Sequence, residues 1–143
     1  MRRLDLAGWA ALWGFWVAAS RRNHPNLTLN LTASALLVAT FAGAAYLNHL
    51  WLIPRLGQAR RFVAYGVALV VVMGGLALGC AAAIHLAYDV LWGPDPARFG
   101  FWTNVGMEFG LVAFHVGAIA AGAWLLGRLR GARSPGVRPS IDR

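Results

Sequence analysis

The sequence predicts an all-α integral membrane protein, a helical bundle with four transmembrane helices. Hydrophobic residues make up 59% of the 143-residue chain and charged residues only 13%, too few to cover a soluble domain of this length. The apolar residues gather in four long runs. All 13 basic residues are Arg and lie in short clusters between these runs. That arrangement is the positive-inside pattern of a membrane protein and excludes a nucleic-acid-binding patch.

The four apolar runs cover residues 6–19, 31–53, 62–91 and 101–126. Each of the last three reaches the roughly 20 residues that cross a hydrocarbon core about 30 Å thick. The first is shorter and rich in Trp, so it either spans a locally thinned bilayer or lies in the interface. The alternative fold is therefore three spans plus an N-terminal interfacial helix.

The distribution of Arg favours four spans with both termini in the cytoplasm of a bacterium. In that topology ten of the 13 Arg lie inside, against eight for the three-span alternative. Residues 1–127 then form a single transmembrane domain in the inner membrane, and residues 128–143 form a basic cytoplasmic tail. The Arg expected to contact anionic lipid or a partner are Arg55, Arg60, Arg61, Arg128, Arg130, Arg133 and Arg138.

Small residues recur about every four positions along the last two spans. Such ridges let helix backbones approach closely in a membrane. They serve either packing within the bundle or contact with another subunit. Leu69 is expected to face lipid, so that Gly79→Leu disrupts assembly more than Leu69→Ala. The residues are Gly75, Gly79 and Ala83 on the third span, and Gly106, Gly110, Ala113, Gly117 and Ala121 on the fourth.

Ionisable side chains inside the spans are candidates for function. His85 and Asp89 share a helical face near the outer end of the third span, and Glu108 lies about two turns into the fourth. This polar cluster could bind a proton or a small cation, or Glu108 pairs with His85 to stabilise the bundle. No metal site, nucleophile–base pair, phosphate-binding loop or pair of catalytic carboxylates is found, so we do not expect an enzyme.

His115 is the candidate cofactor ligand. It lies near the middle of the fourth span, whereas the other intramembrane His residues lie near the two surfaces, so a bis-His haem does not fit their depths. A single His115 could ligate the magnesium of a chlorophyll-type pigment, or it is an interhelical hydrogen-bond donor. No cofactor is therefore predicted.

The stretch YLNHLWLIPRL, residues 46–56, ends the second span. Asn48 and His49 are expected to lie near the inner headgroups, where a polar side chain extends toward water at little cost. Pro54 is expected to end the helix, because proline lacks the N–H that the next turn needs. Arg55 and the Arg pair at 60 and 61 then hold a cytoplasmic hairpin.

Tyr46, Asn48, the Leu-Ile-Pro run that ends at Pro54, Arg61-Phe62 and Tyr65 together resemble a stretch of the N-terminal membrane module of LytS-type bacterial sensor histidine kinases. The resemblance implies a four-helix membrane module that precedes a cytoplasmic kinase. No phosphoacceptor His motif or ATP-binding lobe follows Arg128 in this sequence. Kinase activity is therefore not expected of this polypeptide.

Three functions are consistent with the sequence. The first is a non-catalytic accessory subunit in a larger bacterial membrane complex, for example an energy-transducing one, whose partners are lipids and other membrane subunits. The second is a stand-alone membrane sensor that partners a separate histidine kinase. The third is a pigment- or haem-associated subunit of a photosynthetic or electron-transfer complex that uses His115.

The topology is testable with Gln58 in the predicted cytoplasmic hairpin. In a background without Cys80, a Gln58→Cys variant should resist a membrane-impermeant maleimide in intact cells and react after permeabilisation. Labelling in intact cells would place this hairpin outside and overturn the predicted orientation.

Overall fold

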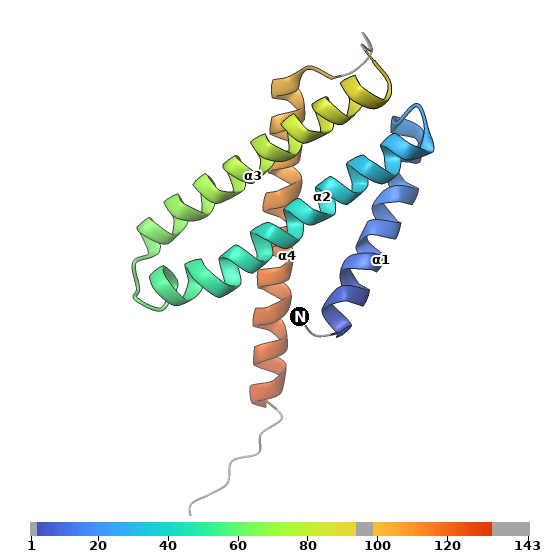
Figure 1. The fold of residues 1–143 in the computed structure, drawn as a ribbon. Helices are drawn as coiled ribbons and strands as arrows, with labels where there is room; N and C mark the ends of the chain where they lie inside the picture. Colours follow the sequence, from blue (N-terminus) through green and yellow to red (C-terminus); the bar gives the residue numbers. More distant parts are fainter. Residues whose placement is uncertain (1–2, 94–98, 133–143) are drawn as a thin grey trace, which may run out of the picture.

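The computed structural model describes residues 3–93 and 99–132, without the side chains of residues 3–5, 123–124, 126–127 and 129–132. Within these ranges the chain is entirely helical and has four long helices, as predicted (Figure 1). The elements are α1 (Arg3–Ser20), the 3-10 turn η1 (Arg21–Asn23), α2 (Leu27–Leu47), η2 (Asn48–Gly57), α3 (Phe62–Leu91) and α4 (Phe101–Ala132).

Three segments of the described chain are long and apolar enough to cross a membrane: Leu27–Gly57, Phe62–Leu91 and Phe101–Gly122. The chain is thus a multi-pass membrane protein. Helix α1, with 18 residues, is not among these three candidate spans.

Helix α1 runs antiparallel to α2 and is tied to it at both ends. At one end the Nδ2 of Asn30 donates to the carbonyl oxygen of Val17 at 2.8 Å, and the Ser20 hydroxyl donates to Asn30 Oδ1 at 2.7 Å. At the other end the indole of Trp9 donates to the Tyr46 hydroxyl at 3.0 Å. The two helices therefore lie side by side from Asn30 to Tyr46.

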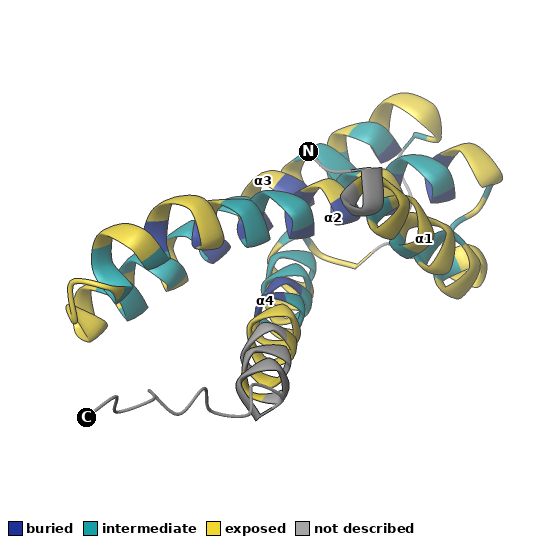
Figure 2. Cartoon of the chain, turned by 90° about the horizontal axis from the view of Figure 1, so that it is seen from below, coloured by how far each residue is buried: buried dark blue, intermediate teal, exposed yellow. Residues whose placement is uncertain are grey.

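Helix α4 crosses α2 and α3 instead of running alongside them, as both views show (Figures 1 and 2). The hydrophobic core lies at this crossing, and Phe41 of α2 is fully buried there. Its ring stacks on the His115 ring of α4 with centroids 3.8 Å apart, and Trp16 of α1 lies 6.1 Å away. The buried core residues are Leu37, Phe41, Ala44, Met73, Val112 and Val116.

The prediction that Pro54 ends the second helix is wrong. Helical turns continue through Pro54 to Gly57 as a π-helix, with hydrogen bonds that reach back five residues. The N–H of Gln58 donates to Ile53 O at 2.9 Å and that of Arg61 to Leu56 O at 3.0 Å. In an α-helix a proline ring clashes with the carbonyl group four residues earlier. The wider turn of a π-helix moves that carbonyl away from the ring, so Pro54 is accommodated. Arg60, with φ 55°, then reverses the chain.

The expected snorkelling of Asn48 is also wrong. Asn48 is buried and accepts a 2.8 Å hydrogen bond from the Tyr65 hydroxyl. This bond joins the start of η2 to the first turns of α3, so Asn48 and Tyr65, two residues of the sensor-kinase-like stretch, are direct partners. His49 is exposed, as expected.

We expect Phe41→Ala to destabilise the fold by about 3–5 kcal/mol, because it removes the ring at the helix crossing and leaves a cavity. Thermal unfolding of the purified protein in detergent micelles measures the loss. Phe62→Ala is the matched control, since Phe62 is 68% exposed at the start of α3. Equal losses in the two variants would show that Phe41 is not the packing centre.

Candidate functional site

A cavity of about 440 Å³ lies among the four helices, toward the end that carries the α1–α2 and α3–α4 connections (Figure 1). All four long helices contribute to its walls, and the η1 loop forms part of its rim. The lining residues are Trp16, Ser20, Arg22, Asn23, His24, Pro25, Ala33, Ser34, Leu37, Ile84, Tyr88, Phe99, Asn104, Met107, Glu108 and Leu111.

Two residues of this wall carry unsatisfied polar atoms. Among the described residues, the buried side-chain atoms without a hydrogen-bond partner are Trp16 Nε1 and Glu108 Oε2. A buried polar atom without a partner is unfavourable, and in a native protein it is usually met by water or a ligand. The predicted intramembrane residue Glu108 is therefore a candidate binding group, and Trp16 joins it.

The predicted cluster of His85, Asp89 and Glu108 does not form a metal site in the described chain, where no three His, Cys, Asp or Glu side chains are placed to hold an ion. Instead, His85 Nε2 lies 2.9 Å from the Asn104 amide nitrogen. Because that nitrogen donates, Nε2 accepts and the ring of a neutral His85 carries its proton on Nδ1. Asp89 is exposed. His85 thus positions Asn104, which lines the cavity.

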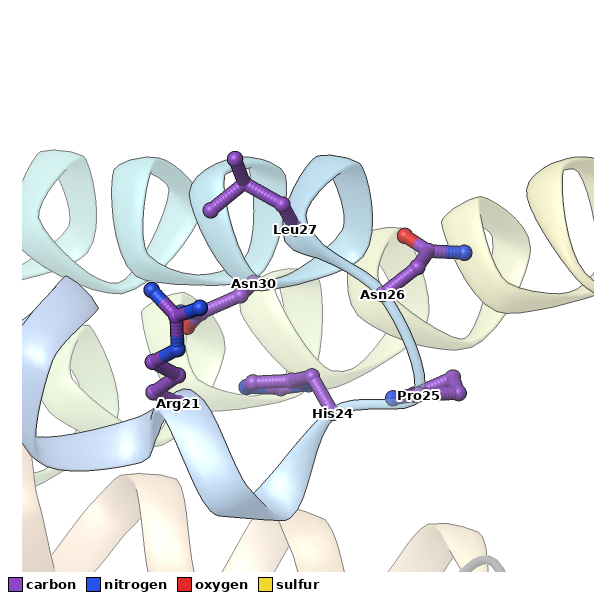
Figure 3. A pocket seen from close by; sticks show the side chains of 6 residues that line it. All are labelled: Arg21, His24, Pro25, Asn26, Leu27 and Asn30. Atoms are coloured by element: carbon purple, nitrogen blue, oxygen red, sulfur yellow. The ribbon is translucent and has the colours of Figure 1, made fainter.

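His24 links the rim to α3. Its Nδ1 lies 2.5 Å from the Tyr88 hydroxyl, and burial lowers the pKa of the imidazole below its ordinary value. A second, smaller cavity of about 200 Å³ adjoins this ring. Figure 3 shows the Arg21, His24 and Asn30 side chains converging on it, whereas Leu27 and Asn26 point elsewhere. Asn26 instead caps α2 by accepting from the N–H of Leu29 at 2.8 Å.

Sequence reasoning missed most of this site. Ser20 and Ser34 line the larger cavity from two helices, and Asn30, which bonds both, shares a face with Ser34 at i and i+4. That spacing of polar residues in an apolar run was a usable signal. His24, however, lies in a loop, and nothing in the sequence relates it to Tyr88, 64 residues later.

His115 packs in the core crossing. Its Nδ1 donates to the carbonyl oxygen of Leu111 at 2.8 Å, so Nε2 of the neutral ring has no proton. One ring face lies on Phe41, and Trp16 is 6.0 Å away. These contacts give the ring a structural role. Cofactor ligation by His115, the alternative to this role, stays untested.

The glycines of the predicted ridges have no neighbour inside the described chain. A Cβ added at Gly75, Gly79, Gly106, Gly110 or Gly117 meets no atom within 4 Å. All five are exposed, as is Ala121, and Ala83 is half-buried. Ala113 alone among the ridge residues packs against the core cluster. The ridges therefore do not hold this bundle together through their glycines, and contact with another subunit stays a prediction.

Leu69 is a further correction, because it packs against the core cluster and does not face only lipid. For the stability of the isolated chain, Leu69→Ala is therefore expected to be more damaging than Gly79→Leu, the reverse of the order predicted from the sequence. Leu69→Ala removes a packing contact, whereas Gly79→Leu adds a side chain in open space.

The basic residues that the structure describes are on the surface. Arg55 lies over the Trp51 ring, 4.9 Å from its centroid, a cation–π contact at the hairpin. Arg60, Arg61 and Arg128 are exposed. The Arg130 side chain and the whole of Arg133 and Arg138 lie outside the described residues. Lipid or partner contact by these Arg stays a prediction.

Comparisons of this chain with protein families, with curated proteins and with solved structures find no match. The resemblance to LytS-type membrane modules therefore rests on the residues of the sequence alone and stays a prediction.

The half-buried His24 predicts a pH-dependent stability. In the unfolded chain its pKa returns to about 6.5, so with falling pH the unfolded state binds a proton before the folded state does. The contribution of neutral His24 to the free energy of unfolding is fully present above about pH 6.5. It is lost as the pH falls toward the lower pKa that His24 has in the folded state. Thermal unfolding in micelles from about pH 8 to pH 5 should show this decline.

His24→Gln should flatten that profile, because glutamine does not titrate but can still bond Tyr88. His49→Gln, at an exposed position of η2, is the control and should keep the wild-type slope. An unchanged slope in the His24 variant would assign the decline to another group.

Proposed function

We propose that the chain is a non-catalytic subunit of a larger bacterial membrane complex, and that its α3 and α4 ridges dock against membrane-spanning helices of other subunits. The α3 ridge is Gly75, Gly79 and Ala83. The α4 ridge is Gly106, Gly110, Gly117 and Ala121, without Ala113, which packs against the core cluster of this chain. The exposure of the glycines in these ridges is the observation that supports the proposal.

Exposure to lipid alone is not evidence of a partner, because lipid solvates Leu and Val side chains well. Exposed glycines are different. A glycine on a lipid-facing surface gives up side-chain packing, whereas between helices it lets two backbones approach and gain dispersion contacts. Both ridges repeat at helical spacing, so each presents a continuous shallow groove to a neighbouring helix.

The packing of α4 also leaves room for a partner. Half of the residues in the α2 span are buried within the chain, against 22% for α3 and 11% for α4. Between Gly117 and Gly122 every residue of α4 is exposed, and five of these six are Gly or Ala, with Ile119 as the exception. Contacts from another subunit would fix this half of α4.

The proposed topology has four spans, with both termini on the cytoplasmic side of the bacterial inner membrane. Helix α1 lies alongside α2 from Asn30 to Tyr46, which favours a spanning helix over one that lies across the membrane surface. The Arg55 to Arg61 hairpin and the basic C-terminal tail then face the anionic inner leaflet.

A second candidate function is a membrane sensor that signals to a separate histidine kinase. The cavity favours it, because all four helices contribute to its walls and a ligand there could change how they pack. A subunit that binds pigment or haem is the third candidate, favoured by the unprotonated Nε2 of neutral His115.

Docking through the ridges predicts a separation between folding and assembly. Gly79→Leu and Gly117→Leu should each leave thermal stability in micelles within about 0.5 kcal/mol of the wild type, since the new side chains meet open space. Each should strongly reduce the recovery of partner subunits when the tagged protein is purified from its own membranes. The absorbance spectrum of the wild-type preparation reports any bound pigment or haem.

Val70→Leu is the matched control, because Val70 is also exposed on α3 but lies nine residues before Gly79, on the opposite face of the helix. It should keep both stability and partners. Undiminished recovery of partners in both glycine variants would overturn docking through the ridges. A wild-type preparation that contains only copies of this chain would replace the proposed complex with a homo-oligomer.

A further inference from the structure

We propose that the cavity among the four helices binds a small zwitterion of the amino-acid class. This inference goes beyond the proposed subunit role, in which the cavity has no part. Its volume of about 440 Å³ lies within the range of small-molecule sites, about 300–1,000 Å³. The exposed loop residues Arg22, Asn23 and Pro25 form its rim, and helix side chains form its walls.

The unmet hydrogen bonds define what a ligand must supply. Most other polar side chains on the wall already have partners: Ser20 bonds Asn30, His24 bonds Tyr88 and Asn104 bonds His85. Trp16 Nε1 and Glu108 Oε2 have none. An indole N–H only donates, so it needs an acceptor, whereas a carboxylate oxygen needs a donor. A purely cationic or purely anionic ligand satisfies only one of the two.

The charges around the cavity point to a zwitterion. Burial in a membrane span disfavours an ionised Glu108 by itself, and an ammonium group stabilises the ionised form because it supplies both the opposite charge and the N–H donors. At the rim, exposed Arg22 presents the opposite charge, which suits a carboxylate. An α-amino acid carries these two groups on adjacent carbons.

The rest of the wall fits a small apolar side chain. Leu37, Ile84, Met107 and Leu111 line the cavity. The aromatic rings of Trp16, Tyr88 and Phe99 add faces that attract an ammonium group. Water alone would meet the two open hydrogen bonds, but it would neither neutralise Glu108 nor fill this apolar surface.

Calorimetric titration of the full chain in detergent micelles tests the proposal with L-valine and two analogues. Isobutylamine lacks the carboxylate, and isovalerate lacks the ammonium group. We expect saturable binding of L-valine, at least about tenfold tighter than of either analogue, because each charge-assisted hydrogen bond contributes about that factor.

Glu108→Gln should weaken L-valine binding by about tenfold or more, and Trp16→Phe, which removes the N–H together with the smaller ring of the indole, by about threefold to tenfold. Asp89→Asn is the control, since Asp89 does not line the cavity, and it should bind as the wild type does. Thermal unfolding of each variant is measured first, to establish that Glu108→Gln folds. If that variant is unfolded, Trp16→Phe and the analogue series decide.

Three results would overturn the proposal. The first is no saturable heat with L-valine up to about 10 mM in folded protein, which means that the cavity holds water only. The second is equal affinity for L-valine and isovalerate, or for L-valine and isobutylamine. The third is unchanged affinity in folded Glu108 and Trp16 variants. None of these outcomes bears on docking through the ridges, which partner recovery tests separately.

Discussion

The packing around Phe41 is the contact on which the whole arrangement depends. The ring is fully buried on α2, and it touches Trp16 from α1 and His115 from α4, in a cluster that also includes Met73 from α3. In a membrane no hydrophobic effect drives helices together, because lipid is as apolar as Leu. Shape complementarity and dispersion must therefore hold the crossing, and a flat ring stacked on a flat imidazole meets that need.

Hydrogen bonds between polar side chains join the helices at points outside the aromatic core. Asn30 ties α1 to α2 at one end, Trp9 and Tyr46 tie them at the other, and Asn48 with Tyr65 joins η2 to α3. Within lipid these groups have no water to bond, so each amide or hydroxyl favours the one geometry that satisfies it. Trp16 Nε1 and Glu108 Oε2 depart from this rule, and both residues line the same cavity. That coincidence is why the cavity, and not the His85 and Asp89 pair, is the candidate site.

Bulky and small residues take unexpected places in this chain. Phe41, Leu37 and Val112 form the core, whereas Gly75, Gly79 and Gly110 lie outside it. In a self-sufficient membrane bundle the glycines are expected at the helix contacts. Here the helices meet through large side chains at a crossing, and the glycines suited to close approach are exposed. The described helices thus pack as a small bundle without using these glycines.

The sequence by itself determined the fold class, because the length and apolarity of a membrane helix are local properties. It predicted four helices, the apolar runs of three spans and the turn near Pro54. The predictions from the sequence were wrong where a residue can adopt more than one local arrangement. Pro54 is accommodated by a wider helical turn, and Asn48 bonds Tyr65 instead of reaching toward water. Only the tertiary structure decided which helix faces meet. Two opposite faces of α4 are both apolar, so composition cannot tell Val112 inside from Gly110 outside. That choice follows from the crossing at Phe41, where contacts between residues distant in sequence select one face, and the same crossing brings Trp16 and Glu108 to one cavity.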